Sequence, residues 1–401
     1  MSASPPSSSW AATTTSSASL IIILTIMGLS MSPPLLMVNA AAGELSFNGT
    51  TFARRLGEVL SFNAPLYNSF FQNTFNPSFV SGLHTDGSPF NCLVVRVTYA
   101  TDPVSRLALS CASDNDNATS LAFSPITKSS VIFWPSTPQE VMGTEDPRIV
   151  QLQDGTYLLF YTAVAPNPTG GAIARLSLAT SQHPTVASSW SRVGALFPDV
   201  NGFQFTKSGA LLINERGLPS YLIFGDCSLY NGLQVALASP TFLNYTIVNN
   251  FLLFERRQGM FDGELVESGP PPVQLSDGNW LFLYNAAQKL DGSSNGLFYA
   301  PGYVILNGSN VLQVLRRSDK PLLMPEASWE TIGQTTYVVF ASGLRRVPNT
   351  GDDTFVVYYG AADTNVGAML VRYVPFEGSS AAAGGKDGPR PPAGRVFARR
   401  L

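Results

Sequence analysis

The sequence predicts an all-β protein, and three observations support that prediction. Glycine (34 residues) and proline (29 residues) are plentiful in a chain of 401 residues. No long stretch repeats its apolar residues with the period of a helix, whereas short apolar runs follow turn signals such as QDGT and SDGN. These runs also recur at steps of roughly 60–75 residues, and periodic β units of this kind indicate a repeat architecture.

Five runs carry the repeat, and each ends in or near an aromatic or polar residue. They are LVVRV from Leu93, YLLFYT from Tyr157, YLIFGD from Tyr221, WLFLYN from Trp280 and FVVYYG from Phe355. A further strand-like segment follows most of them, so that each unit is a small meander. Such units form the blades of a propeller around a central axis. The sequence therefore predicts a five-bladed β-propeller, with repeats longer than the ~40–45 residues of short-blade propellers.

The propeller is predicted over residues 43–376, between two segments that lie outside the fold. Residues 1–42 begin with an uncharged Ser/Thr/Pro/Ala tract, continue with the apolar run LIIILTIMGLSM, and end in the small residues VNAAA. This order is typical of a signal peptide or another targeting segment. Residues 377–401 contain little that a core could bury, and we predict that they form a disordered tail.

The N-terminal segment predicts entry into the secretory pathway, or an extracellular protein. Its apolar run is short for a membrane span, but the segment lacks the Lys or Arg that usually precedes such a run. A plastid transit segment and an uncleaved type II membrane anchor therefore stay open, and we expect membrane contact only if the segment is not cleaved. Four N-x-S/T sequons favour a secreted glycoprotein. They lie at Asn48, Asn117, Asn244 and Asn307.

Cysteine and charge content exclude several classes of function. The three cysteines do not form a disulfide framework; Cys92 and Cys111 could pair across neighbouring strands, although buried free thiols are the favoured interpretation. With only two histidines and no Cys/His spacing for a metal, we expect no metal or organic cofactor. The net charge is −3 without a basic block, so nucleic acid is not an expected partner.

Three ionisable residues, Glu145, Asp146 and Arg148, stand directly before a hydrophobic run, in a chain with only 13% charged residues. In a propeller the innermost strand of each blade starts or ends near the axis, so residues that flank equivalent strands can converge there. The pattern predicts a polar pocket at the axis. Its candidate residues are Asn76, Arg96, Glu145, Asp146, Lys207, Asp226, Glu267, Asn285 and Glu330.

A ring of carboxylates with a few cations suits carbohydrate chemistry. Glycoside cleavage needs one carboxylic acid to protonate the leaving oxygen and one carboxylate to act on water or on the sugar. Position alone also leaves structural alternatives open: the Glu-Asp pair could cap a turn and bind Arg148, Asp226 could form an Asx-turn, and three tyrosines are more simply core aromatics. These tyrosines are Tyr161, Tyr284 and Tyr359.

Six motifs occur in the order seen in glycoside hydrolase family 130. They are GTEDPRI, KSGAL, VESGPPPV, FLYNAA, KPLLMPEASWE and VVYYGAADTNVGA, and the chain resembles the family from about Asn76 to Tyr373. The resemblance implies a five-bladed propeller that cleaves β-mannoside oligosaccharides or glycans with inversion, using inorganic phosphate in the phosphorylases and water in the hydrolases. It also implies that Asp146 is the proton donor and acts through a sugar hydroxyl.

Two departures from the phosphorylase pattern favour hydrolysis. Asn285 stands where the phosphorylases that this chain resembles carry a His, and Gly225 with Asp226 stands where they carry a basic pair. An Asp there would repel phosphate. The chain is also similar to the subgroup with VE-GPP and YN-A elements, and this resemblance implies a β-1,2-mannosidase-like hydrolase with Glu267 as general base, a task that Asp226 could share. A β-mannoside phosphorylase and a non-catalytic carbohydrate-binding propeller stay open as alternatives. The residues expected to bind substrate are Asn76, Arg96, Glu145, Arg148, Lys207, Tyr284, Asn285, Glu330 and Asp363.

Overall fold

The described part of the protein is all-β, with very little helix. The computed structural model describes residues 50–61, 71–115, 117–168, 170–197, 205–214, 217–226, 230–351 and 353–375. Within these ranges the helical residues form three short 3-10 turns and one α-helix of four residues, α1 (Ser328–Thr331), and none of them is long and apolar enough to cross a bilayer. The described residues belong to one compact unit, Phe47–Leu401. The predicted targeting segment and the predicted tail lie outside them.

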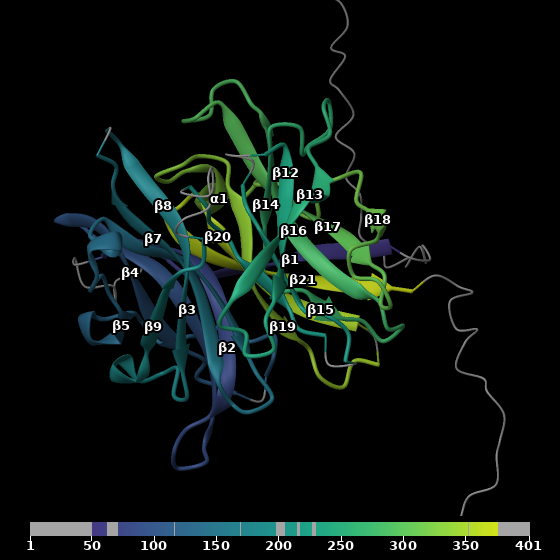
Figure 1. Cartoon of the computed structure of the whole chain (residues 1–401). Coiled ribbons are helices and arrows are strands. Elements are labelled where there is room, and N and C mark those ends of the chain that lie inside the picture. Colours follow the sequence, from purple (N-terminus) through teal and green to yellow (C-terminus); the bar gives the residue numbers. More distant parts are fainter. Residues whose placement is uncertain are drawn as a thin grey trace, which may run out of the picture. The chain divides into compact units, whose positions relative to one another are not determined.

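One sheet joins the first described strand to the last strands of the chain (Figure 1). Its strands are paired antiparallel in the order β1-β21-β20-β19. The strands are β1 (Thr50–Leu60), β19 (Val339–Arg346), β20 (Asp353–Ala361) and β21 (Asn365–Val374). Residues about 300 positions apart are therefore hydrogen-bonded neighbours, such as Thr51 and Tyr373.

Two further sheets are antiparallel meanders whose strands follow chain order. The first contains β10 (Ala210–Leu212), β11 (Tyr221–Phe224), β12 (Gly232–Ala238) and β13 (Tyr245–Glu255). The second contains β14 (Leu265–Ser268), β15 (Val273–Gln274), β16 (Trp280–Lys289), β17 (Leu297–Leu306) and β18 (Val314–Arg317). In the second sheet both β14 and β15 pair with β16, because a proline run separates them.

The remaining sheet has eight strands and consists of two antiparallel groups. A single parallel bridge, between Ser105 and Gly143, joins β4 to β6. The first group contains β2 (Phe71–Leu83), β3 (Pro89–Tyr99), β4 (Asp102–Cys111) and β5 (Val131–Phe133). The second contains β6 (Gly143–Gln151), β7 (Tyr157–Pro166), β8 (Ala172–Ser181) and β9 (Ser191–Ala195).

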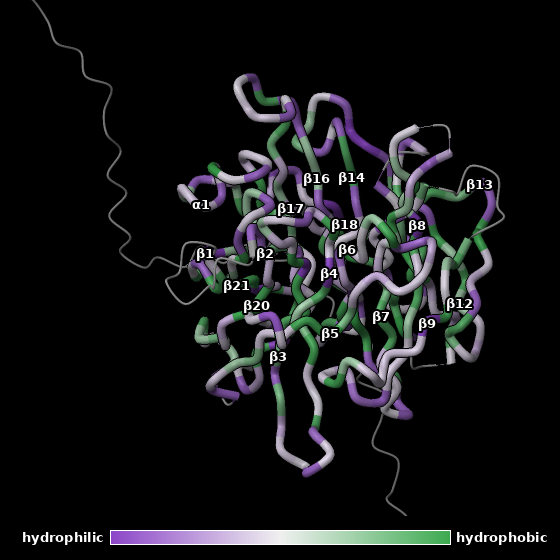
Figure 2. The backbone as a smooth tube through the Cα atoms, turned by 90° about the vertical axis from the view of Figure 1, so that its left-hand side faces the viewer, coloured by the Kyte–Doolittle hydropathy of each residue, from purple (hydrophilic) through white to green (hydrophobic). Residues whose placement is uncertain are grey.

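The hydrophobic core lies between the sheets rather than within one sandwich. Alternate side chains of a strand point to opposite faces, so Leu158 and Phe160 of β7 pack toward β11, while Leu159 and Tyr161 pack toward β3. Both faces of each central strand are thus covered, which explains why the repeated runs are almost continuously apolar. Figure 2 shows the same pattern, with hydrophobic segments along interior strands and hydrophilic residues in many connecting loops.

The structure corrects the interpretation of two cysteines as free thiols. Cys92 on β3 and Cys111 on β4 are directly opposite each other, with their Cα atoms 3.9 Å apart, and they form a disulfide. The pairing depends on strand register, and a shift of one residue would have turned the two side chains to opposite faces. Cys227 lies outside the described residues.

Candidate active site

Two β-bulges turn polar side chains toward a common cavity. Asn76 on β2 and Asp146 on β6 each precede a proline, and each lies at a break in the strand register. Their φ angles are 47° and 50°, in the left-handed region that Asn and Asp tolerate better than most residues. Proline cannot donate to the ladder and is therefore confined to edges and bulges, and bulges near functional sites often re-aim a side chain. Here Asn76 Nδ2 donates to Asp146 Oδ1 over 2.8 Å.

Arg96 connects Asp146 to its neighbour Glu145. Its guanidinium donates to Glu145 Oε1 over 2.7 Å and to Asp146 Oδ1 over 3.1 Å, and its Nε donates to Ser105 Oγ. Burial alone would raise the pKa of the Asp146 carboxyl, but the nearby cations Arg96 and Lys207 hold that pKa below its ordinary value. For Glu145, burial outweighs the effect of Arg96 and raises the pKa.

Lys207 lies between two further carboxylates. Its Nζ is 3.4 Å from Asp226 Oδ2 and 3.4 Å from Glu267 Oε1. Burial opposes the charge on Lys207, but these two acids raise its pKa above the ordinary value. Glu267 is buried and also accepts a hydrogen bond from the hydroxyl of Ser208. Because burial disfavours its charged form, the pKa of Glu267 is raised, although Lys207 counteracts this in part.

The cavity between these groups has a volume of about 180 Å³. Six residues expected from the sequence line it: Asn76, Arg96, Asp146, Lys207, Glu267 and Asp363. They come from loops and strands that are far apart in the chain, as the prediction of a convergent polar pocket requires. Burial raises the pKa of Asp363 above its ordinary value, with a hydrogen bond from Thr335 acting in the opposite direction.

The sequence of this chain matches one family of known proteins. The family model of glycoside hydrolase family 130, described as beta-1,4-mannooligosaccharide phosphorylase, matches residues 68–373, which is more than half of the chain. The chain belongs to glycoside hydrolase family 130. The resemblance inferred from the six motifs is thereby confirmed.

Two β-mannoside phosphorylases are similar to this chain. A 1,2-beta-oligomannan phosphorylase from Thermoanaerobacter sp. (strain X514) is 29% identical over 235 residues, which cover 59% of this chain and 70% of the relative. A beta-1,2-mannobiose phosphorylase from the same strain is 27% identical over 237 residues, covering 58% and 68%.

A solved structure shares the fold of this family 130 chain. It was reported with the finding that the family of mannoside phosphorylases contains glycoside hydrolases that target beta-1,2 mannosidic linkages in Candida mannan. It matches with a TM-score of 0.64 and 24% identity, covering 82% of this chain and 95% of the other.

Arg148 of the family 130 motif EDPR does not line the cavity, contrary to our expectation that it binds substrate. It is fully buried, and its guanidinium donates to backbone carbonyl groups rather than to Glu145. Those acceptors belong to Asp146, Pro147, Ser268 and Gly269. The partner of Glu145 is Arg96 instead.

Three other predicted substrate-binding residues are used elsewhere. The Tyr284 hydroxyl donates to Asp262 over 2.8 Å inside the core, which fits its interpretation as a core aromatic. The Asn285 amide exchanges two hydrogen bonds with the backbone of Ala341 on the neighbouring sheet. Glu330 on α1 accepts from Arg55 and from a tyrosine. Tyr284 and Asn285 lie on β16, where adjacent side chains face different neighbours, and Glu330 lies on the short helix. None of the three lines the cavity.

Sequence reasoning missed one wall of the family 130 cavity. Asn295 and Thr335 line it from two connecting segments, and Tyr299 lines it from β17. Ser294 and Thr336 join the two connecting segments through reciprocal backbone-to-hydroxyl hydrogen bonds. Loop residues carry no periodicity, so no sequence signal identified them. Apolar residues complete the wall. Two of them could have been found from the sequence, because Phe75 directly precedes a predicted residue and Leu265 lies two residues before another. The apolar wall residues are Phe75, Leu265, Val338 and Phe340.

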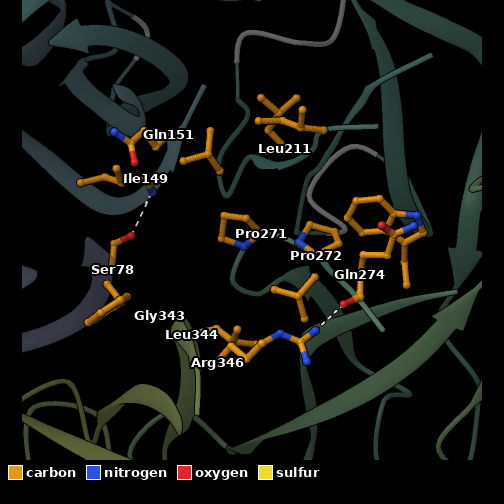
Figure 3. Close-up of a pocket in the computed structure, with 15 residues that line it drawn as sticks. Ser78, Ile149, Gln151, Leu211, Pro271, Pro272, Gln274, Gly343, Leu344 and Arg346 are labelled. Atoms are coloured by element: carbon orange, nitrogen blue, oxygen red, sulfur yellow. Dashed lines mark hydrogen bonds between the residues drawn. The ribbon is translucent and has the colours of Figure 1, made fainter. Parts of the chain in front are cut away.

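A larger cavity of about 440 Å³ lies further along the same inner strands (Figure 3). Ser78 and Ile149 follow the two bulges, and Pro271 follows β14. Among its described lining residues Arg346 alone is charged, and that side chain is paired with Asp353. The larger cavity therefore lacks the carboxylates that glycoside cleavage needs, whereas carboxylates do line the smaller one.

Proposed function

We propose that this protein cleaves β-linked mannosides with inversion, using Asp146 and Glu267. The observation that supports this most directly is that both carboxylates line one cavity and each uses only one oxygen for described contacts. Asp146 Oδ1 accepts from Asn76 and Arg96, and Glu267 Oε1 accepts from Ser208 and faces Lys207. Within the described residues the second oxygen of each carboxylate has no hydrogen-bond partner, so each can bind a substrate hydroxyl or a water molecule.

Phosphorolysis is the first candidate reaction. Both curated relatives described above are named as phosphorylases of β-linked mannosides, and the matching family model has a phosphorylase description. These names support phosphorolysis better than hydrolysis. The cations that face the cavity, Arg96 and Lys207, are the groups that would bind an inorganic phosphate.

Hydrolysis is the second candidate, and one observation favours it. The Lys207 ammonium group is shared between Asp226 and Glu267, so a phosphate dianion at this position would meet two carboxylates. A water molecule at the same position would instead find a base. The departure at Asp226 from the phosphorylase pattern supports the same reaction.

The pKa directions in the free protein constrain the roles of the two acids. Asp146 is held below its ordinary pKa, although a proton donor must be protonated. Burial is the largest influence on its pKa and acts upward, so a sugar that fills the cavity and displaces water shifts the carboxyl toward the protonated form. We propose that substrate binding raises the pKa of Asp146, which then passes its proton to the leaving oxygen through a sugar hydroxyl.

We propose that the sheets are the blades of a five-bladed β-propeller. The single bridge that divides the eight-stranded sheet supports this arrangement. Five hydrophobic clusters also support it, because each packs strands of one sheet or group against the next along the chain. The last of them packs Val356 and Tyr358 of β20 against Leu93 and Val95 of β3.

We also propose that the protein follows the secretory route. The Cys92–Cys111 disulfide supports this proposal, since such bonds persist mainly in oxidising compartments. The sequon residues Asn117 and Asn244 are exposed and accessible to glycosylation. A shift in electrophoretic mobility after N-glycanase treatment of protein from its native cells is the expected result. An unshifted, full-length chain would contradict the proposal.

The reaction is tested by incubating the purified protein with β-1,2- and β-1,4-mannobiose, with and without inorganic phosphate. Phosphorolysis produces mannose 1-phosphate only when phosphate is present, whereas hydrolysis produces two mannose molecules in either case. NMR of the first product should show the α-anomer if the configuration inverts. No product from any mannobiose, together with measurable mannose binding by calorimetry, would favour the carbohydrate-binding alternative.

A further inference from the structure

We propose that Arg148 is a positioning residue that fixes the distance and orientation between Asp146 and Glu267 across the cavity. It also supplies a positive charge that acts on both carboxylates. This inference rests on the proposed function of those two carboxylates. Arg148 has an exposed fraction of 0% and lines neither of the two cavities described above. Its guanidinium carbon lies 5.8 Å from the ring centre of Phe340, which does line the active-site cavity.

The hydrogen bonds of Arg148 join the two strands that carry the acids. Its Nη1 donates to the carbonyl of Asp146 over 3.1 Å. Its Nε donates to the carbonyl of Gly269 over 2.8 Å and its Nη2 to that of Ser268 over 3.2 Å, and Ser268 directly follows Glu267. One planar guanidinium therefore ties the backbone of the Asp146 bulge to the backbone beside Glu267. The rigid fork of donors fixes both distance and orientation, which a flexible ammonium group would not do.

The charge of Arg148 is not balanced by an adjacent carboxylate. Within the described part of the chain, its hydrogen bonds go to carbonyl oxygens, and burial lowers its pKa from the ordinary arginine value. The negative charges that oppose this lowering are those of Asp146 and Glu267. Through a poorly polarisable interior, a buried cation acts on such groups over longer distances than in water. Arg148 in turn stabilises the ionised form of Asp146.

Other inner strands are connected by neutral side chains. The connecting role of Arg148 can therefore be considered separately from its charge. Ser342 donates to the Pro77 carbonyl over 2.7 Å, and the Ile149 backbone donates to Ser78 Oγ over 2.9 Å (Figure 3). Hydrogen bonding between inner strands thus requires no charge. The connection between the two acids is made by a guanidinium, and this difference points to a function of the charge itself.

The test compares Arg148→Lys, Arg148→Gln and the control Ser342→Ala, which removes a neutral connection between inner strands. The wild type is first assayed on mannobioses with and without phosphate. Turnover, KM, the pH profile of kcat/KM and the melting temperature are then measured for each variant. We expect kcat to fall about 10-fold or more in both Arg148 variants, while KM changes less than about 3-fold, because the sugar-facing groups are kept.

The pH profile distinguishes positioning with charge from a structural role. Arg148→Gln should move the profile to higher pH, because loss of a cation raises the pKa of nearby carboxyls, whereas Arg148→Lys and Ser342→Ala should leave its position unchanged. Folded Arg148→Gln protein with the profile and kcat of Ser342→Ala overturns the inference. If Arg148→Gln does not fold, an Arg148→Lys variant with wild-type kcat overturns it. A wild type inactive on every mannobiose refutes the proposed function instead.

Discussion

Two sets of buried carboxylates in this protein differ in how they are hydrogen-bonded. Asp146 and Glu267 line the cavity. Three others support the sheets, and each of these accepts a hydrogen bond from a tyrosine of a central strand and pairs with an arginine. The supporting groups are Glu140 with Tyr161 and Arg192, Asp262 with Tyr284 and Arg317, and Glu330 with Tyr359 and Arg55.

Burial does not distinguish the two sets, since Glu140 is 1% exposed and Glu267 is 2% exposed. The difference lies in their unused hydrogen-bonding capacity. Both oxygens of Glu330 are occupied, one by Tyr359 and Arg55, the other by Arg55 and two backbone amides. Buried polar groups are normally satisfied in this way. A carboxylate with one oxygen left for a ligand is therefore a better sign of a reactive site than a buried carboxylate alone.

The largest expected effect is on turnover at the cavity. Asp146→Asn and Glu267→Gln should each lower kcat by about 10²-fold or more, because each removes a proton-transfer partner in hydrolysis. In phosphorolysis the expected loss for Glu267→Gln is smaller, since phosphate itself is the nucleophile. Mannose binding, measured by calorimetry, should survive in both variants. Near-full activity of Asp146→Asn would show that it only lines the cavity.

The supporting carboxylates should show the opposite behaviour. Glu330→Ala leaves Arg55 and Tyr359 without their buried partner and should lower the free energy of unfolding by about 3–5 kcal/mol. Urea denaturation measures this loss, and kcat per folded molecule should be retained. A stable Glu330→Ala protein without turnover would contradict the comparison and return Glu330 to the active site.

A third experiment separates the two roles along one strand. β3 carries Cys92 at its disulfide end and Arg96 at the cavity. Replacing Cys92 and Cys111 together with serine should cost about 2–4 kcal/mol of stability, because the unfolded chain loses its cross-link. The kcat of the folded protein should not change. Titration of more than one thiol in the denatured, unreduced wild type would show that the disulfide is absent.

The smallest expected effect concerns the pH dependence of stability, and its sign differs between the two acids. The pKa of Asp146 is lowered, so its ionised form stabilises the fold above the ordinary Asp value, and this contribution disappears as the pH falls through the folded pKa. Asp146→Asn should therefore reduce the melting temperature at pH 7 but not in strong acid.

The pKa of Glu267 is raised, so its contribution to stability is present below the ordinary Glu value and is lost as the pH rises through the folded pKa. Glu267→Gln, which resembles the protonated acid, should therefore raise the melting temperature at pH 7, and the gain should vanish near pH 4. Melting curves between pH 3 and pH 8 test both signs. Equal shifts in the same direction would refute the difference in ionisation.

The sequence by itself determined the β class, the family and the charged residues that line one cavity. Its repeated apolar runs and the polar residues that flank equivalent runs were local signals, because residues beside equivalent strands of a propeller can converge near the axis. Convergence of Asn76 with Asp146, and of Lys207 with Glu267, followed from that repetition and is present in the structure.

Only the tertiary structure decided which polar residues beside these strands reach the cavity. A strand residue changes face when the register moves by one position, and a single sequence does not specify that register. For this reason Tyr284 and Asn285 are adjacent in sequence yet point to different neighbours, and Arg148 is buried two residues after Asp146. The cysteine pairing and the loop wall formed by Asn295 and Thr335 likewise depend on contacts between distant segments, which leave no periodic signal in the chain.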